Sequence, residues 1–204
     1  MTYETLQQQF QMLYQHKAQG VASAPGRVNL IGEFTDYNQG FVFPCSLGFR
    51  TLVLFRRRTD QQLVVHSVNY PGEHDSFALD QAISAGPSQW GNYIRAMAYV
   101  LKKAGHSLAG ADILISSDVP QGAGLSSSAA LEVAVAGAFN HISALGLSLQ
   151  QIALFGQQAE NEFMDCQCGI MDQLISAKGQ QGHALLIDCS DLQTTAVPLP
   201  EDIK

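Results

Sequence analysis

The feature that most constrains this chain is a glycine-rich loop that runs directly into a helix with few polar residues. The loop and first helical turn read Pro-Gln-Gly-Ala-Gly-Leu-Ser-Ser-Ser-Ala over residues 120–129, and apolar residues continue through Val135. A helix that is apolar on nearly every side has to be buried between layers. Its N-terminus offers free N–H groups and a partial positive charge beside glycines that allow close approach, an arrangement that suits a phosphate.

This loop is not the common nucleotide-binding loop, because no Gly-Lys-Ser/Thr follows the glycines. A glycine-rich turn capped by serine is the alternative, and the loop alone does not choose between the two. Ser128 begins the helix, and its hydroxyl is a candidate ligand for a magnesium ion that bridges phosphate oxygens. Such a site also needs a carboxylate. Glu160 is the candidate, with an exposed helix glutamate as the alternative.

The composition is that of one large globular domain or two small ones. The 204 residues are 46% hydrophobic and 14% charged, which excludes a disordered chain. Eleven basic residues against eighteen acidic ones give a net charge of −7, which argues against a nucleic-acid partner. The one basic cluster, residues 56–58, ends a strand-like run and is predicted to be solvated charge at a sheet edge.

The N-terminus and the cysteines indicate a cytoplasmic chain. Residues 1–10 are polar and lack the apolar core of a signal peptide, and no window approaches a transmembrane span. The four cysteines are Cys45, Cys166, Cys168 and Cys189. The spacing of the middle two is too tight for the usual zinc pair, so reduced and mostly buried thiols are expected. The six histidines show no metal-ligand spacing.

Strands and helices are predicted without regular alternation, which indicates an α+β fold. Ser148 and Gln151 form a predicted capping box, and Ser88 starts another helix. Predicted helices cover residues 2–18, 88–103, the stretch after the glycine-rich loop, 148–163 and 169–177. Predicted strands cover residues 21–23, 51–55, 63–66, 112–116 and 184–187.

Residues 26–38 place one cation and two carboxylates among glycines. Arg27, Glu33 and Asp36 interrupt an otherwise apolar stretch. Carboxylates carry the acceptor oxygens that orient a polyhydroxyl ligand. A turn with surface carboxylates is the alternative interpretation of this segment.

Asp172 is an acid at an otherwise apolar helix start, flanked by Ile170, Met171 and Leu174. A partly buried carboxylate needs a partner or a proton, and Arg27 is the partner that we predict. A helix N-terminal carboxylate stabilised by the helix dipole is the alternative.

Together these segments resemble the galactokinase branch of the GHMP family of small-molecule kinases, along almost the whole chain from Ala24 to Cys189. Gly-Glu-x-Thr-Asp-Tyr-Asn (32–38) resembles the galactose-binding run, Gly-Leu-Ser-Ser-Ser-Ala (124–129) the family loop, and Gly-Ile-Met-Asp-Gln (169–173) the catalytic run. The resemblance implies a GHMP kinase N-terminal domain over residues 1–204, an α+β fold of the ribosomal protein S5 domain 2-like type with helices packed on a mixed sheet. It also implies that the family's C-terminal domain lies outside this chain.

The resemblance further implies a reaction and a set of site residues. ATP, with Mg²⁺, would phosphorylate the anomeric hydroxyl of galactose; Asp172 would accept its proton and Arg27 would stabilise developing charge. Magnesium would be held by Ser128 and Glu160. Trp90 and Tyr93 would lie near the adenine or serve as core. Sugar binding would fall to Glu33, Phe34, Thr35, Asp36 and Gly169, and ATP binding to Gly122, Ala123, Gly124, Leu125, Ser126, Ser127 and Ser128.

Two departures from the family pattern modify these expectations. Phe34 stands where the family has histidine, so one hydrogen bond to the sugar is expected to be missing. The family's chains are much longer than 204 residues and contribute further active-site groups. We therefore expect a fragment with little or no galactose-dependent ATP turnover by itself. A monomer is expected for a full-length protein, and self-association of the fragment is left open.

The sequence is also compatible with two other functions. One is a catalytically silent sensor that binds galactose and ATP, although the Ser128-Ala129 pair favours the enzyme. The other is a kinase for a related sugar such as N-acetylgalactosamine, with Phe34 reshaping the pocket. No nucleic-acid or membrane partner is expected.

Overall fold

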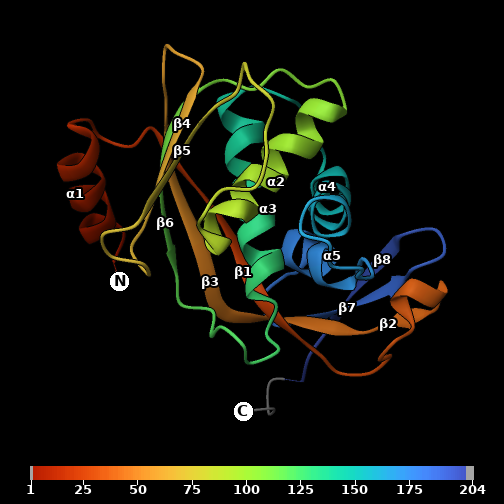
Figure 1. The fold of residues 1–204 in the computed structure, drawn as a ribbon. Helices are drawn as coiled ribbons and strands as arrows, with labels where there is room; N and C mark the ends of the chain where they lie inside the picture. The colour runs from red at the N-terminus through yellow and green to blue at the C-terminus, as the bar shows by residue number, and fades with distance from the viewer. Residues whose placement is uncertain (1, 201–204) are drawn as a thin grey trace.

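The structure, a computed structural model, describes residues 2–200 as a mixed sheet of eight strands with helices on both faces (Figure 1). The helices are α1 (Tyr3–Tyr14), η1 (Asp36–Asn38), α2 (Gln89–Lys103), α3 (Ser127–Ile142), α4 (Leu149–Glu162) and α5 (Met171–Lys178). The strands are β1 (Gly20–Asn29), β2 (Phe41–Val42), β3 (Pro44–Arg57), β4 (Gln62–Ser67), β5 (His74–Ala78), β6 (Ala111–Ser117), β7 (His183–Asp188) and β8 (Gln193–Pro198).

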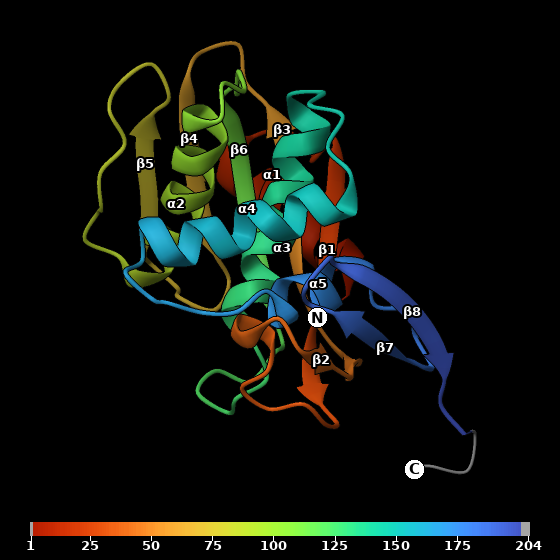
Figure 2. The same ribbon diagram turned by 90° about the vertical axis from the view of Figure 1, so that its right-hand side faces the viewer.

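The long strand β3 connects the two parts of the sheet. Its second half lies between β1 and β6, and β4 and β5 continue the sheet beyond β6. Its first half pairs with β7 at Cys45, and β7 carries β2 and β8. Only the β4–β6 pair is parallel, so the sheet is mixed, as predicted. Figure 2 shows α2, α3 and α4 in front of the larger part, with β7 and β8 projecting below and to the right.

The alternation of side chains along β3 produces two cores. Val53 and Phe55 face the main core with α2 and α3, whereas Leu54 faces a smaller core with Leu6 and Phe10 of α1. Because successive strand residues point to opposite faces, a strand that is apolar throughout can be covered on both sides. A third core lies beneath α5, between α4 and β7.

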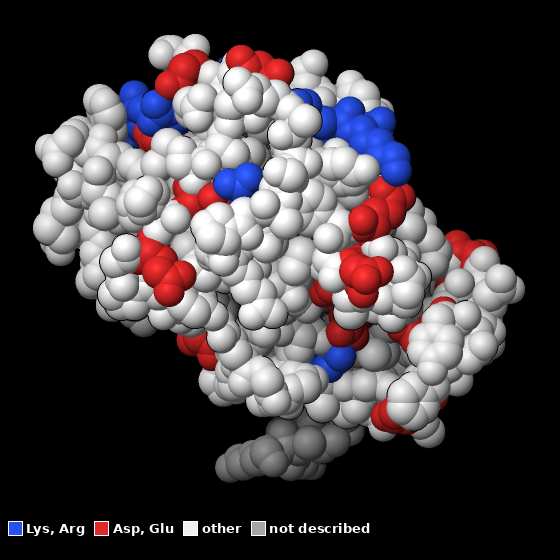
Figure 3. Space-filling view, in the orientation of Figure 1, with Lys and Arg blue, Asp and Glu red and all other residues white. Residues whose placement is uncertain are grey.

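Helix α3 is buried along most of its length, as its composition predicts. Ser88 caps α2, and Ser148 and Gln151 form the predicted capping box of α4. Within residues 2–200 no helix combines the length and the apolar character that crossing a bilayer requires. Figure 3 shows lysines and arginines in small separate groups on one face of the molecule.

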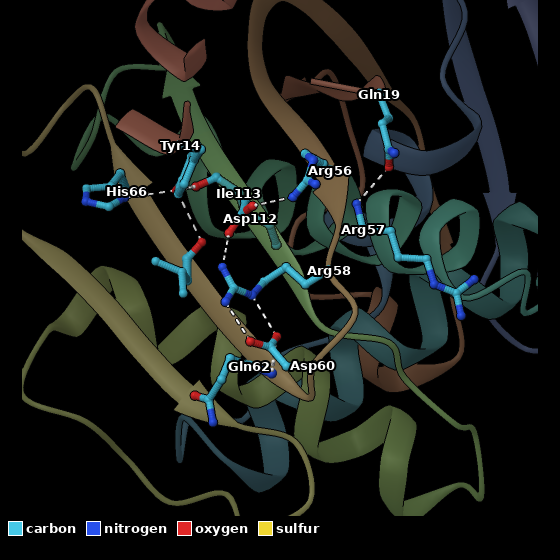
Figure 4. Close-up of polar contacts among 11 residues, drawn as sticks. Tyr14, Gln19, Arg56, Arg57, Arg58, Asp60, Gln62, His66, Asp112 and Ile113 are labelled. Carbon is cyan, nitrogen blue, oxygen red and sulfur yellow. Dashed lines mark hydrogen bonds and ion pairs between the residues drawn. The ribbon is translucent and has the colours of Figure 1, made fainter. Parts of the chain in front are cut away.

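The prediction that residues 56–58 are solvated edge charges is wrong for two of the three arginines. Since β3 is an inner strand, Arg56 lies opposite Asp112 of β6, which is buried. Arg56 and Arg58 bind the Asp112 carboxylate at 3.2 and 2.6 Å, and Arg58 also binds Asp60 at 2.6 Å. Only the Arg57 side chain points away from this cluster (Figure 4).

All four cysteines are free thiols, as predicted. Cys45 and Cys189 are buried, but Cys166 is exposed and Cys168 is only partly buried, so the expectation of mostly buried thiols holds for half of them. Burial raises the pKa of Cys168 to about 12 and that of Cys189 to about 11, so these two thiols are poor nucleophiles.

Candidate functional site

Arg27 and Asp172 form the centre of the candidate site, although 145 residues separate them in the chain. The Arg27 Nε donates to Asp172 Oδ1 at 2.7 Å, and a terminal nitrogen donates to Oδ2 at 2.6 Å. Their side chains are 14% and 30% exposed. The predicted partnership is therefore confirmed, and its two parallel bonds fix the plane of the carboxylate.

An irregularity in strand pairing places Arg27 at this point. In the β1–β3 ladder Pro25 pairs with Arg50, but Arg27 pairs with Ser46, so Gly26 alone lies opposite several residues of β3. A side-chain carbon on Gly26 would lie 2.8 Å from the Leu125 carbonyl oxygen. The glycine thus lets β1 approach the loop closely, and an irregular ladder can re-aim the side chain that follows it.

The glycine-rich loop of residues 120–128, named the phosphate loop after its predicted role, touches both members of the pair. The Gly124 carbonyl accepts a bond of 2.7 Å from Arg27, and the Ser126 hydroxyl donates to Asp172. Gly122 and Gly124 have φ angles of +71°, which glycine adopts without strain. Ser126 also has a left-handed conformation, with φ 57°, and its hydroxyl binds Asp172 instead of capping α3. Such conformations cluster at functional sites.

A pocket of about 430 Å³ opens beside the phosphate loop. Ser127 and Ser128 lie at its α3 end, and Trp90 and Tyr93 of α2 line it. The Trp90 ring stacks nearly parallel to Tyr70, with 5.8 Å between centroids. Trp90 and Tyr93 also pack in the main core, as one of the two interpretations expects, and their place near adenine stays a prediction.

Other polar groups of the pocket were not predicted from the sequence. Trp90 Nε1 donates to Glu73 at 2.9 Å, and the Tyr70 hydroxyl donates to Gln121 of the phosphate loop at 2.9 Å. Tyr70 and Glu73 come from the connection between β4 and β5. The place of this connection beside α2 depends on the parallel pairing of β4 with β6. The sequence holds no local signal for this contact.

Asp36 comes together with Gly169, which precedes Asp172 by three residues in the chain. A side-chain carbon on Gly169 would lie 1.9 Å from the Asp36 Oδ2, so the carboxyl rests against the glycine backbone. Glu33 is exposed and accepts a bond of 3.1 Å from the Asn29 amide. No hydrogen bond within residues 2–200 joins Glu33 or Asp36 to the Arg27–Asp172 pair.

The remaining two residues of the predicted sugar set differ in how free they are to bind a ligand. The Thr35 hydroxyl lies 2.8 and 2.7 Å from the Gly32 and Phe41 carbonyls, so it is engaged within its own segment. Phe34 is 75% exposed, with a left-handed φ of 64°. A large side chain in this conformation is uncommon and strained.

Glu160 is buried, with 5% exposure, so it is not the exposed helix glutamate of the alternative interpretation. It lies against Glu132 of α3, which is fully buried. Burial first, and then the Glu160 carboxyl, raise the pKa of Glu132 well above its usual value. Burial and the same two carboxyls raise the pKa of Tyr93 to about 12.

The donor set fits a hard cation in chemistry, because a serine hydroxyl and a carboxylate are oxygen ligands of the kind that magnesium takes. Glu132 Oε1, which is buried and has no hydrogen-bond partner among residues 2–200, adds a second acidic oxygen beside Glu160. Over the same residues there is no cluster of three or more histidine, cysteine, aspartate or glutamate side chains that could hold a metal. Magnesium bound here would therefore depend on phosphate oxygens and water for its other ligands.

Two family descriptions match this chain. Residues 92–180 match the GHMP kinases N-terminal domain, and residues 8–57 match the galactokinase galactose-binding signature. The first region contains the phosphate loop, Glu160 and Asp172, and the second contains Arg27 and residues 32–38.

Solved structures share this fold. The chain is similar to galactokinase of Lactococcus lactis in complex with galactose, with 34% identity and a TM-score of 0.90 over 97% of this chain and 52% of that one. It also matches a D-glycero-D-manno-heptose 1-phosphate kinase from Bacteriodes thetaiotaomicron (16% identity, TM-score 0.69, 88% and 60% covered). Mevalonate kinase of Methanococcus jannaschii matches with 18% identity and a TM-score of 0.70, over 87% of this chain and 55% of that one. The last two show the fold alone.

Proposed function

Because this chain belongs to the GHMP kinase family, we propose that it supplies the galactose-binding and ATP-binding groups of a galactokinase. The reaction is transfer of the γ-phosphate of ATP to the anomeric hydroxyl of galactose, which gives galactose 1-phosphate. The chain spans about half the length of the lactococcal galactokinase, 52%, so the activity proposed is that of the whole protein.

The observation that carries this proposal is the position of the Arg27–Asp172 pair. The pair is bonded to Gly124 and Ser126 of the phosphate loop. Asp36 of the galactose-binding signature lies against Gly169, three residues before Asp172 in the chain. A carboxylate that is bonded to the phosphate loop and close in sequence to a contact of the sugar-binding segment supports the proposal that Asp172 accepts a proton from a sugar hydroxyl.

The chain's own residues supply most of what phosphoryl transfer requires, which is positioning and neutralisation of charge. The α3 N-terminus and the loop N–H groups hold the phosphates, and the Arg27 guanidinium keeps Asp172 oriented and adds positive potential. Asp36 and Glu33 orient the sugar hydroxyls. Ser128 and Glu160 would hold magnesium, which would supply positive charge that neutralises the phosphates. The four free thiols agree with a reducing compartment, so we place this function in the cytoplasm.

Nucleotide binding can be tested with the chain itself. Trp90 is the only tryptophan of the sequence and lines the pocket, so its emission reports on that pocket alone. We expect ATP with Mg²⁺ to change this emission saturably, whereas inorganic phosphate, which does not reach the aromatic wall, leaves it unchanged. A flat titration with ATP would contradict the proposed nucleotide site.

The second test asks whether Phe34 sets the affinity of the chain for galactose. Phe34→His restores a hydrogen-bonding group, and histidine also tolerates a left-handed φ better than phenylalanine does. Since a buried hydrogen bond is worth about 1–3 kcal/mol when lost, galactose affinity should rise about 5- to 150-fold. Isothermal titration calorimetry with galactose and with N-acetylgalactosamine measures this change.

Phe49→His is the matched control, because Phe49 is an exposed phenylalanine of β3 outside residues 32–38. It should leave affinity for both sugars unchanged. Should unsubstituted protein prefer N-acetylgalactosamine and Phe34→His reverse that preference, the related-sugar kinase would replace galactokinase as the proposed function. Equal affinities before and after Phe34→His would mean that Phe34 does not set sugar affinity.

A further inference from the structure

Helix α3 carries an acid whose presence the main core does not explain. Glu132 is 0% exposed, in a helix that is otherwise almost entirely apolar. It follows Ser128 by four residues, so both project from the same face, one turn apart. Burying a carboxyl costs free energy unless other groups hydrogen-bond it, so an apolar residue would be the simpler choice for packing alone.

Glu132 connects two other helices. The Gln173 amide nitrogen donates to Glu132 Oε2 at 3.1 Å, and Gln173 is itself buried at the start of α5. The Glu160 carboxyl of α4 is a second polar group beside Glu132. Among residues 2–200, Glu132 Oε1 and Gln173 Oε1 have no hydrogen-bond partner. This is a polar junction of three helices inside an apolar core.

The fold leaves room for this junction at one glycine of α4. A side-chain carbon on Gly156 would lie 2.9 Å from Gln173 Cγ and 3.4 Å from Glu132 Oε2. Any larger residue there would push the amide and the carboxyl apart. The close approach of α4 therefore depends on a glycine at the point where α3 and α5 exchange their hydrogen bond.

We propose that Glu132 and Gln173 are positioning residues that connect Glu160, which would hold magnesium, to Asp172, the proposed proton acceptor. The inference rests on the proposed function and extends it to two residues to which that function gave no role. Gln173 follows Asp172 directly, so the bond to Glu132 fixes the first turn of α5 and the Asp172 backbone with it. Carboxylates that ligate metals are commonly oriented by such outer hydrogen bonds, whose removal costs about 10- to 100-fold in metal affinity.

The test compares nucleotide binding with and without magnesium. Trp90 emission is titrated with adenylyl imidodiphosphate in excess Mg²⁺ and again in EDTA. The readout is the dissociation constant in EDTA divided by the dissociation constant in Mg²⁺. We expect Glu132→Leu to reduce this ratio about tenfold or more while the value in EDTA is unchanged. Glu132→Gln keeps an oxygen that accepts from Gln173 and gains an N–H that donates to Glu160, so it should retain the ratio.

Glu162→Gln is the matched control, since Glu162 lies on α4 two residues after Glu160 but pairs with Lys103 at the surface. It should leave the ratio unchanged. Circular dichroism confirms that each variant folds, and Gln173→Met, which nearly preserves volume, replaces Glu132→Leu should the latter not fold. A purely structural role would lower the melting temperature and leave the ratio intact.

The outcomes separate the two proposals. If unsubstituted protein shows magnesium-dependent binding and Glu132→Leu and Gln173→Met show it equally, this inference is overturned and the proposed function stands. If unsubstituted protein gains nothing from Mg²⁺, the proposed metal role of Glu160 fails and the inference fails with it. A loss with Leu or Met that Gln at position 132 rescues supports the positioning role.

Discussion

Gly169→Ala is expected to reduce galactose affinity about 100-fold, because the new methyl group would occupy the position of the Asp36 carboxyl. The added carbon would lie 1.9 Å from Asp36 Oδ2 and 2.1 Å from Asp36 Cγ, closer than any non-bonded contact. Asp36 must swing away, which removes a charged acceptor from the sugar-binding segment. Isothermal titration calorimetry with galactose measures the loss, and Trp90 emission shows whether nucleotide binding is retained.

Gly48→Ala is the control for this substitution. Gly48 lies in β3, and a side-chain carbon there would meet no other atom within 4 Å. The same addition of one methyl group should therefore leave galactose affinity unchanged. An unaltered affinity for Gly169→Ala would show that Asp36 does not bind the sugar, and it would weaken the galactose assignment of residues 32–38.

Arg27→Met is expected to lower the free energy of unfolding by about 2 kcal/mol, between the values for exposed and fully buried ion pairs. The variant keeps the aliphatic stem but loses two bonds to Asp172 and one to Gly124, and it leaves a carboxylate only 30% exposed without its cation. For a domain of this size the melting temperature should fall by about 4–8 °C. Because the phosphate loop loses an anchor, Trp90 emission should also respond less to ATP.

Arg57→Met is the matched control. Arg57 is the last residue of β3, and its side chain is exposed. Its backbone N–H donates to the side-chain oxygen of Gln19, a bond that the substitution leaves in place. We expect a change within about 0.5 kcal/mol, as for most surface substitutions. Equal melting temperatures for the two variants would mean that the Arg27–Asp172 pair adds nothing to the stability of the fold.

The elements predicted well were those with local physical signals. Ser88 and the Ser148–Gln151 capping box mark helix starts through side-chain bonds to nearby backbone, so the sequence contains all that these starts need. The first helix was predicted too long, because it ends where Gln15 adopts a left-handed conformation. Strands β2, β5 and β8 were missed, since they are short or polar and depend on pairing with β7 or β4.

In the candidate site, too, contacts with a signal in the sequence were predicted and contacts between distant loops were not. Arg27 and Asp172 were paired correctly because a buried charge requires an opposite charge and Arg27 was the cation among the sugar-segment motifs. Three contacts depend on how loops approach one another, and the sequence did not predict them. They are the bond of Ser126 to Asp172, the contact of Asp36 with Gly169 and the stack of Tyr70 on Trp90. Glu132 did have a signal, since it is the one acid in a helix that has to be buried. Asp112 had none, because its arginine partners follow from the order of the strands.

Strand β3 is a single covalent element that belongs to both parts of the sheet. Its ladder with β1 is irregular between Ser46 and Arg50, the stretch that lies opposite Gly26. Relative tilting of the smaller part, which carries β7, would therefore concentrate at this joint, where the β1–β3 register shifts. Since Arg27 sits beside that joint, a small flexure there would change the reach of its guanidinium before it disturbed either packed core, and substrate alignment would be the first property to respond.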